Sequence, residues 1–118
     1  MNKPTIYLET TVVGHLAARQ QSDIIVAARQ LATHVWWRRR HEYEVVVSLI
    51  VLDECGSGDP TEASERLEMI SDSMVLDAKP EADDLAMLLT AHHGIPETEP
   101  GDALHIAIAA VGGIQYLL

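Results

Sequence analysis

Short apolar runs alternate with amphipathic stretches along the chain, and this alternation predicts strands and helices in turn. Four apolar runs have the length and composition of strands: residues 5–8, 45–47, 74–76 and 114–118. Strands that alternate with helices are typical of a parallel sheet with helices on both faces. The sequence therefore predicts an α/β fold of three layers, α/β/α, in a single domain over residues 1–118.

Polar residues and prolines mark the predicted helix ends. Thr10 or Thr11 is suited to cap a helix beginning near Val12, because a hydroxyl accepts from free N–H groups of the first turn. Ser22 or Asp23 is suited to cap a longer helix in the same way. Further helices are predicted to begin at Asp59–Pro60, at Pro80 (ending at Gly94) and at Asp102.

The longer helix is predicted from apolar residues that recur at helical spacing and reaches about Arg40. These residues are Ile24, Ala28, Leu31 and Val35. Its end, Trp36-Trp37-Arg38-Arg39-Arg40, is interpreted as core or interface aromatic residues followed by cations that the helix dipole favours.

Composition bounds the class of protein. With 47% apolar residues in 118, the chain can bury a core of its own and is too apolar for a disordered segment. No apolar run approaches the ~20 residues that span a bilayer, and the N-terminus lacks the layout of a signal peptide. The single cysteine, Cys55, excludes an internal disulfide and fits a reducing compartment. We therefore expect a cytoplasmic protein with no membrane partner.

The formal net charge of −10 constrains the partners of the protein. Nucleic-acid binding is driven largely by Lys and Arg side chains that neutralise phosphates, so this charge argues against simple RNA or DNA binding. It does not exclude a metal-dependent nuclease, because a metal site concentrates carboxylates and the bound cations restore positive potential. The charge therefore leaves the reaction type open.

Three acidic residues stand where predicted strands give way to helices or where a helix begins. Glu9 ends the first apolar run, Glu54 follows the run Val45–Leu52, and Asp102 opens the last predicted helix. Ligands of open parallel sheets gather beyond the carboxyl ends of the strands, so these three carboxylates are predicted to converge there. Carboxylate oxygens suit a hard divalent cation, and the sequence therefore predicts a metal site.

Each candidate also has an ordinary structural interpretation. Glu9 can lie in solvent or near the dipole of a helix N-terminus, and Asp102 can be the N-cap of its helix. Asp53 and Glu54 point about 100° apart on a helical turn, so only one can face Glu9, and spacing does not choose between them. His105, three residues after Asp102, is in such an apolar helix more often a packed, hydrogen-bonded histidine than a ligand.

Other chemistries find little support in the sequence. His92 and His93 are adjacent and diverge on a helix, and no cysteine or second histidine pair has the spacing of zinc ligands. There is no glycine-rich phosphate loop and no nucleophile elbow. Ser48 and Cys55 have no evident activating base, so nucleophilic catalysis is disfavoured.

Together these motifs resemble the PIN domain family, and particularly its VapC-like toxins of type II toxin–antitoxin pairs. The matching segments are Ile6–Gly14, Val47–Ser48 followed by Glu54, and Gly101–Ala107. The resemblance covers nearly the whole chain and implies a Mg²⁺- or Mn²⁺-dependent endoribonuclease that hydrolyses phosphodiester bonds of single-stranded RNA.

The resemblance also assigns roles to individual residues. It implies that the catalytic and metal-binding acids are Glu9, Glu54 and Asp102, with Thr10 as a supporting hydroxyl, and it thereby selects Glu54 over Asp53. The partners that it implies are an RNA substrate, a second copy in a homodimer, and a cognate antitoxin. Such an antitoxin can place a basic side chain in the acidic pocket, which the charge of that pocket favours.

Two departures from the family's pattern support a second hypothesis. The first acidic position is usually Asp, whereas Glu9 carries its carboxylate one methylene further from the backbone. A fourth position, expected after the last strand, is missing because the chain stops at Leu118 inside that predicted strand, as a truncated reading frame would. The alternative is therefore a catalytically impaired PIN-like module that acts through protein binding or dimerisation.

Overall fold

Four parallel strands form one sheet in the computed structural model, which describes residues 3–77, 79–92 and 100–118. The strands are β1 (Thr5–Tyr7), β2 (Glu44–Ser48), β3 (Met74–Leu76) and β4 (Tyr116–Leu117). Their order in the sheet is β3-β2-β1-β4. Ile6 lies opposite Val45 on one side and Tyr116 on the other, so β1 is central. The all-parallel pairing confirms the predicted α/β fold.

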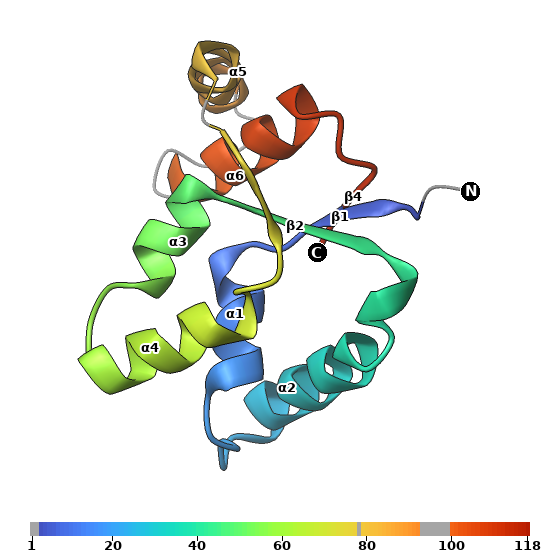
Figure 1. Ribbon diagram of the computed structural model, residues 1–118. Coiled ribbons are helices and arrows are strands. Elements are labelled where there is room, and N and C mark those ends of the chain that lie inside the picture. Colours follow the sequence, from blue (N-terminus) through green and yellow to red (C-terminus); the bar gives the residue numbers. More distant parts are fainter. Residues whose placement is uncertain (1–2, 78, 93–99) are drawn as a thin grey trace.

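Helices make the crossovers that parallel strands require. They are α1 (Thr10–Ala17), α2 (Ile24–Trp37), α3 (Leu49–Cys55), α4 (Pro60–Met69), α5 (Pro80–Ala91) and α6 (Pro100–Val111), with a short 3₁₀ turn, η1 (Arg40–Glu42). In Figure 1, α5 and α6 lie on one side of the sheet and α1, α2 and α4 on the other. Within the described residues, no helix is long and apolar enough to cross a bilayer.

The starts of three helices show how side chains fix the helix ends. Asp23 caps α2 and Asp59 caps α4 as predicted, each accepting the N–H of the residue three positions later at 3.0 Å. The prediction for α1 was wrong, because neither threonine caps it. Glu9 has an extended backbone and its Oε1 accepts the N–H of Val12 at 3.1 Å. Glu9 therefore has a structural role whatever else it does.

Other element ends differ from the predictions by a few residues. α2 ends at Trp37, and η1 follows where the sequence predicts a last helical turn. α6 begins at Pro100, so Asp102 lies in its first turn rather than at its cap. β4 covers only two of the residues predicted for it. The predicted helix end at Gly94 lies outside the described residues.

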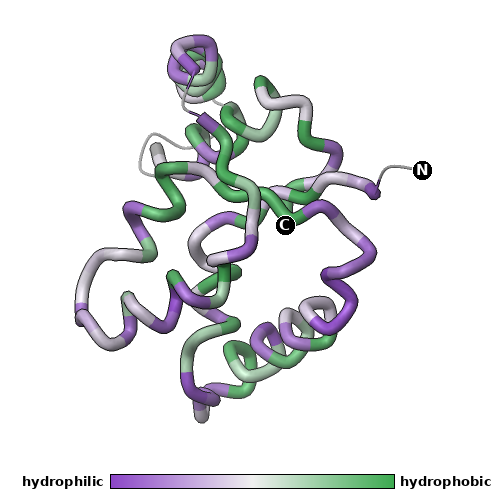
Figure 2. Tube along the Cα trace, in the orientation of Figure 1, coloured by the Kyte–Doolittle hydropathy of each residue, from purple (hydrophilic) through white to green (hydrophobic). Residues whose placement is uncertain are grey.

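The hydrophobic core lies along the central strands and the helices next to them, where Figure 2 shows hydrophobic stretches. Its fully buried members include Tyr7, Leu8, Val13, Val47, Val51 and Ala107. On α6 the inward positions Ala103 and Ala107 are small, so the helix can pack closely on its neighbours. This packing sets the position of His105, which lies between them on the chain and is itself buried.

The apolar face of α2 does not join this core. Ile24 is 85% exposed, Leu31 67% and Val35 52%, although their spacing places them on one side of the helix, as the sequence predicts. Gln30 is the buried residue of this helix instead. It accepts from the backbone N–H of Gln21 and donates to the carbonyl of Arg19, both at 3.0 Å, which fastens α2 to the segment before it.

Candidate functional site

Five polar side chains from five different elements are joined by hydrogen bonds near the carboxyl ends of β1 and β2. The Tyr7 hydroxyl lies 2.8 Å from Ser48 Oγ and 2.7 Å from His105 Nδ1. The other ring nitrogen of His105, Nε2, lies 2.8 Å from Glu54 Oε1. Thr10 Oγ1 donates to the same carboxylate oxygen at 2.9 Å. We call these residues the carboxyl-edge network.

The sheet and its first helical turns bring these side chains together. Tyr7 pairs with Val46 across β1 and β2, so Ser48, two residues further along β2, points to the same face as Val46. Ser48 then caps α3, its Oγ accepting the N–H of Val51 at 3.3 Å. Glu54 lies near the end of this helix, facing the start of α1 and the middle of α6. Local capping therefore sets the position of a long-range network.

Burial decreases along the network from the core toward solvent. Tyr7 is 0% exposed, Ser48 2% and His105 4%, whereas the Glu54 side chain is 43% exposed. In the described part of the chain, every buried side-chain nitrogen or oxygen has a hydrogen-bond partner. Polar groups are costly to bury unless they are paired, so the network is stable only as a complete set.

Burial also fixes protonation states close to the network. It raises the pKa of Tyr7 to about 12, with the nearby Glu54 and Glu9 carboxylates adding to the rise while the Ser48 hydrogen bond opposes it. Tyr7 therefore keeps its proton at neutral pH. Burial likewise raises the pKa of the Cys55 thiol, which agrees with the weak case for a thiolate nucleophile in the sequence.

The structure places the three predicted acids in different settings. Glu54 belongs to the network, and it is Glu54 rather than its exposed neighbour Asp53 that contacts Thr10 and His105. Glu9 is half-buried and caps α1 directly before Thr10. Asp102 is exposed in the first turn of α6, one turn before His105. Glu54 is thus hydrogen-bonded to α1, which Glu9 caps, and to α6, which contains Asp102.

Whether the described side chains could hold a metal ion depends on how they are grouped. Within residues 3–77, 79–92 and 100–118, no three His, Cys, Asp or Glu side chains are grouped so that they could hold one ion. Mg²⁺ usually keeps several waters and binds one or two protein carboxylates, so these donors fit a water-rich site better than a closed cage. That Glu9, Glu54 and Asp102 share an ion stays a prediction.

Sequence reasoning identified part of this arrangement. The interpretation of His105 as a packed, hydrogen-bonded histidine is confirmed. The roles of Tyr7 and Ser48 were missed, although each is a hydroxyl at the carboxyl end of an otherwise apolar strand. A hydroxyl in that position must find a partner when it is buried, and this was the available signal.

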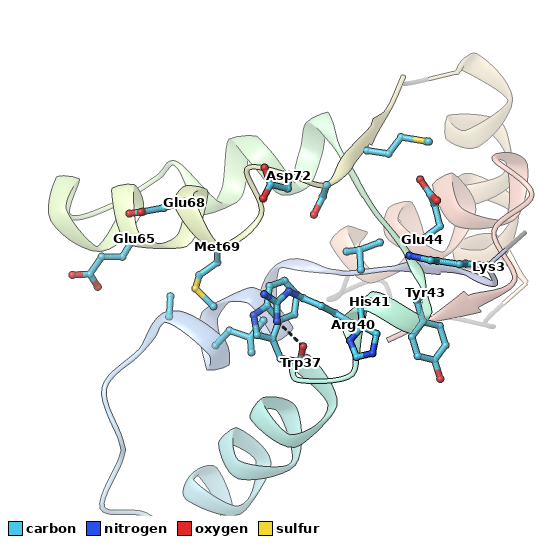
Figure 3. Close-up of a pocket in the computed structure, with 15 residues that line it drawn as sticks. Lys3, Trp37, Arg40, His41, Tyr43, Glu44, Glu65, Glu68, Met69 and Asp72 are labelled. Atoms are coloured by element: carbon cyan, nitrogen blue, oxygen red, sulfur yellow. Dashed lines mark hydrogen bonds between the residues drawn. The ribbon is translucent and has the colours of Figure 1, made fainter.

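A cavity of about 830 Å³ lies at the opposite, amino end of the sheet (Figure 3). Its lining carries both signs of charge, the cations being Lys3 and Arg40 and the acids Glu44, Glu65, Glu68 and Asp72. The Arg40 guanidinium lies 4.6 Å from the centre of the Trp37 ring and donates to the Trp37 carbonyl at 2.9 Å. We call this the amino-end cavity.

No protein-family model matches the sequence, and a search of curated proteins found no significant relative. The described residues define an α/β protein, in which they form a four-stranded parallel sheet and six helices. The resemblance to the PIN domain family remains a hypothesis.

Proposed function

We propose that the protein is a divalent-cation-dependent endoribonuclease that hydrolyses phosphodiester bonds of single-stranded RNA, as a PIN-like, VapC-type toxin would. The observation that carries the proposal is the position of Glu54. It lies partly exposed beyond the carboxyl end of β2, hydrogen-bonded to Thr10 beside Glu9 and to His105 one turn from Asp102. Carboxyl ends of parallel strands are the usual place for ligands in such folds.

The residues of this edge have distinct parts in the proposal. Glu9, Glu54 and Asp102 supply the carboxylates that would hold Mg²⁺ or Mn²⁺, and Thr10 restrains Glu54. The chemistry that a bound cation supplies is acidification of a coordinated water and neutralisation of phosphate charge. With a net charge of −10, the protein needs that neutralisation before it can hold RNA at an acidic edge.

The direct test is cleavage of a labelled single-stranded RNA by the purified full chain with Mg²⁺, Mn²⁺ or EDTA. We expect cleavage with either cation and none with EDTA. Glu54→Gln and Asp102→Asn are expected to reduce cleavage to the EDTA level, because each keeps the size of its side chain and removes its charge.

Asp53→Asn is the matched control for Glu54→Gln, since it removes one exposed carboxylate from the same helical turn. It is expected to keep the wild-type rate. Cleavage that survives both Glu54→Gln and Asp102→Asn would show that another site or a contaminating nuclease is responsible.

A second candidate function is the one favoured by α2. Its stripe of exposed apolar residues, Ile24, Leu31 and Val35, suits burial against a second copy of the chain, as a catalytically impaired binding module would need. On this view the carboxyl edge is structural and α2 is the functional surface. A dimer and an active nuclease are compatible, so the two candidates differ only in their need for metal and RNA.

Thermal denaturation with Mn²⁺ separates the two candidates, and sedimentation tests the dimer on which the binding module depends. The binding module predicts a dimer that Leu31→Glu dissociates and no thermal shift with Mn²⁺. Arg29→Glu is the control, because Arg29 is exposed on α2 outside the stripe. A monomeric wild-type protein would remove the support for this candidate.

A further inference from the structure

Counting hydrogens in the carboxyl-edge network assigns a donor and an acceptor to each bond. Ser48 Oγ accepts from the Val51 N–H, so its own hydrogen is free to be donated, and the partner found for it is the Tyr7 oxygen. Tyr7 must then donate its hydrogen to its other partner, His105 Nδ1. A ring nitrogen that accepts carries no hydrogen.

The remaining ring nitrogen completes the assignment. Neutral imidazole carries one hydrogen, so His105 is protonated on Nε2 and donates to Glu54 Oε1. With a hydrogen on Nδ1 alone, the Nε2 lone pair would face the carboxylate oxygen. With hydrogens on both nitrogens, the buried hydroxyl of either Tyr7 or Ser48 would have no acceptor. An unsatisfied buried donor typically costs about 1–3 kcal/mol. The Nε2–H form alone satisfies every group.

All donors therefore point the same way. The bonds run from the Val51 N–H at the start of α3, through Ser48, Tyr7 and His105, to the carboxylate of Glu54. Each bond in such a series polarises the next, and three of the members are almost fully buried. Thr10, at the start of α1, adds a second donor to the same oxygen.

We propose that Tyr7 and His105 are positioning residues that orient the Glu54 carboxylate through this directed series of hydrogen bonds. A carboxylate oxygen has two lone pairs, and the two donors found for Glu54 both occupy Oε1. In the proposal, Oε2 is therefore the oxygen that binds a cation. This role for Glu54 rests on the proposed function, whereas the orientation of the bonds does not.

In many metal proteins, hydrogen bonds from neighbouring residues hold the metal ligands in place. Loss of such a bond typically lowers metal affinity about 10–100-fold. Tyr7 is 0% exposed, so its effect on a cation must pass through its partners, His105 and Ser48. Tyr7→Phe removes a single oxygen from the series and keeps the aromatic ring in the core. Tyr43→Phe is the matched control, because Tyr43 lies directly before β2 at the amino-end cavity.

The test combines ring-nitrogen NMR of His105 with titration of Mn²⁺ alone, followed by calorimetry or by the electron spin resonance of free Mn²⁺. His105→Gln identifies the His105 signals by their loss. We expect the wild type to show His105 protonated on Nε2 only, and Tyr7→Phe to mix in the other forms. Tyr7→Phe is expected to bind Mn²⁺ about 10–100-fold more weakly, and Tyr43→Phe as the wild type does.

The NMR spectrum and the Mn²⁺ titration can contradict different parts of the proposal. A wild-type His105 protonated on Nδ1, or on both nitrogens at neutral pH, overturns the directed series without any variant having to fold. Unchanged Mn²⁺ affinity in Tyr7→Phe overturns the positioning role. If the wild type shows the Nε2–H form but binds no Mn²⁺, the orientation of the series is supported and the proposed nuclease function is overturned.

Discussion

The two ends of the sheet contrast in what they bury. The amino-end cavity offers about 830 Å³ of space, and the charged side chains in its lining are exposed and of both signs. The carboxyl edge instead holds Tyr7, Ser48 and His105 almost completely buried, each with a hydrogen-bond partner. Burying polar groups is costly unless all are paired, whereas a hollow between exposed side chains needs no such arrangement. We therefore base the proposed function on the paired polar groups of the carboxyl edge and not on the volume of the amino-end cavity.

The largest difference between the two ends is expected in packing. Leu8 is 0% exposed behind the carboxyl edge, and Met74 at the cavity is 52% exposed. Leu8→Ala is expected to lower the free energy of unfolding by about 2–5 kcal/mol, because it leaves a void in the core. Met74→Ala is expected to stay within about 0.5 kcal/mol. Urea denaturation of both variants measures this, and equal losses would remove the contrast.

The next comparison is between the stability effects of replacing one histidine at each end of the sheet. His105→Ala removes two hydrogen bonds and a packed ring, so we expect the free energy of unfolding to fall by about 1–3 kcal/mol. His41→Ala, at an exposed position lining the amino-end cavity, is expected to change it by less than about 0.5 kcal/mol. The same denaturation series tests both, and a loss at His41 as large as that at His105 would contradict the contrast in burial.

Alkaline pH should weaken the carboxyl edge selectively. The pKa of Tyr7 is raised by burial from its usual 10.0 to about 12. Between these values the unfolded chain loses the Tyr7 proton while the folded protein keeps it, so stability present below pH 10 is lost as pH rises. The loss due to Tyr7 is expected to be about 2 kcal/mol by pH 12.

Stability of the wild type and of Tyr7→Phe, measured across this alkaline range, isolates the contribution of Tyr7. The difference in free energy of unfolding between the two proteins should narrow as pH rises from 10 toward 12. A constant difference would mean that Tyr7 titrates alike in the folded and unfolded chain.

The smallest effect is expected for the ion pair between Arg39, directly before η1, and Glu42 within it, near the amino-end cavity. Arg39 lies 2.7 Å from Glu42, and both side chains are exposed. The hydrogen bond from Arg39, with its charge, holds the pKa of Glu42 below its usual range, so any stability it adds is lost as pH falls. Arg39→Gln should return the pKa of Glu42 to that range in an NMR titration and leave the unfolding midpoint unchanged.

The helices α2 and α6 show how far the sequence could predict the fold. Both carry apolar residues at helical spacing, and both were predicted as helices. Periodicity tells which residues share a face but not what that face contacts, so nothing in it distinguishes buried Ala107 from Leu31, which is 67% exposed. The contact depends on which helices the sheet order places beside each strand, and that is a property of the whole chain.

The candidate site was predictable in part for a similar reason. Local patterns correctly assigned Glu9 to a strand end and Asp102 to a helix start. They did not place Glu54, which lies near the end of α3. The choice of Glu54 over Asp53 depended on a resemblance, and the contacts with Thr10 and His105 now support it. The bond between Tyr7 and His105 joins residues 98 positions apart, and no local pattern predicts such a pair.

Paramagnetic broadening by Mn²⁺ tests most directly whether the carboxyl edge is the metal-binding end. In the described part of the chain, acidic residues lie around Glu54 at the carboxyl edge and around Glu65 and Glu68 at the amino-end cavity. In an amide NMR spectrum titrated with Mn²⁺, we predict broadening first around Glu9, Glu54 and Asp102, and its loss in Glu54→Gln. Broadening centred on α4, or unchanged by Glu54→Gln, would contradict the account.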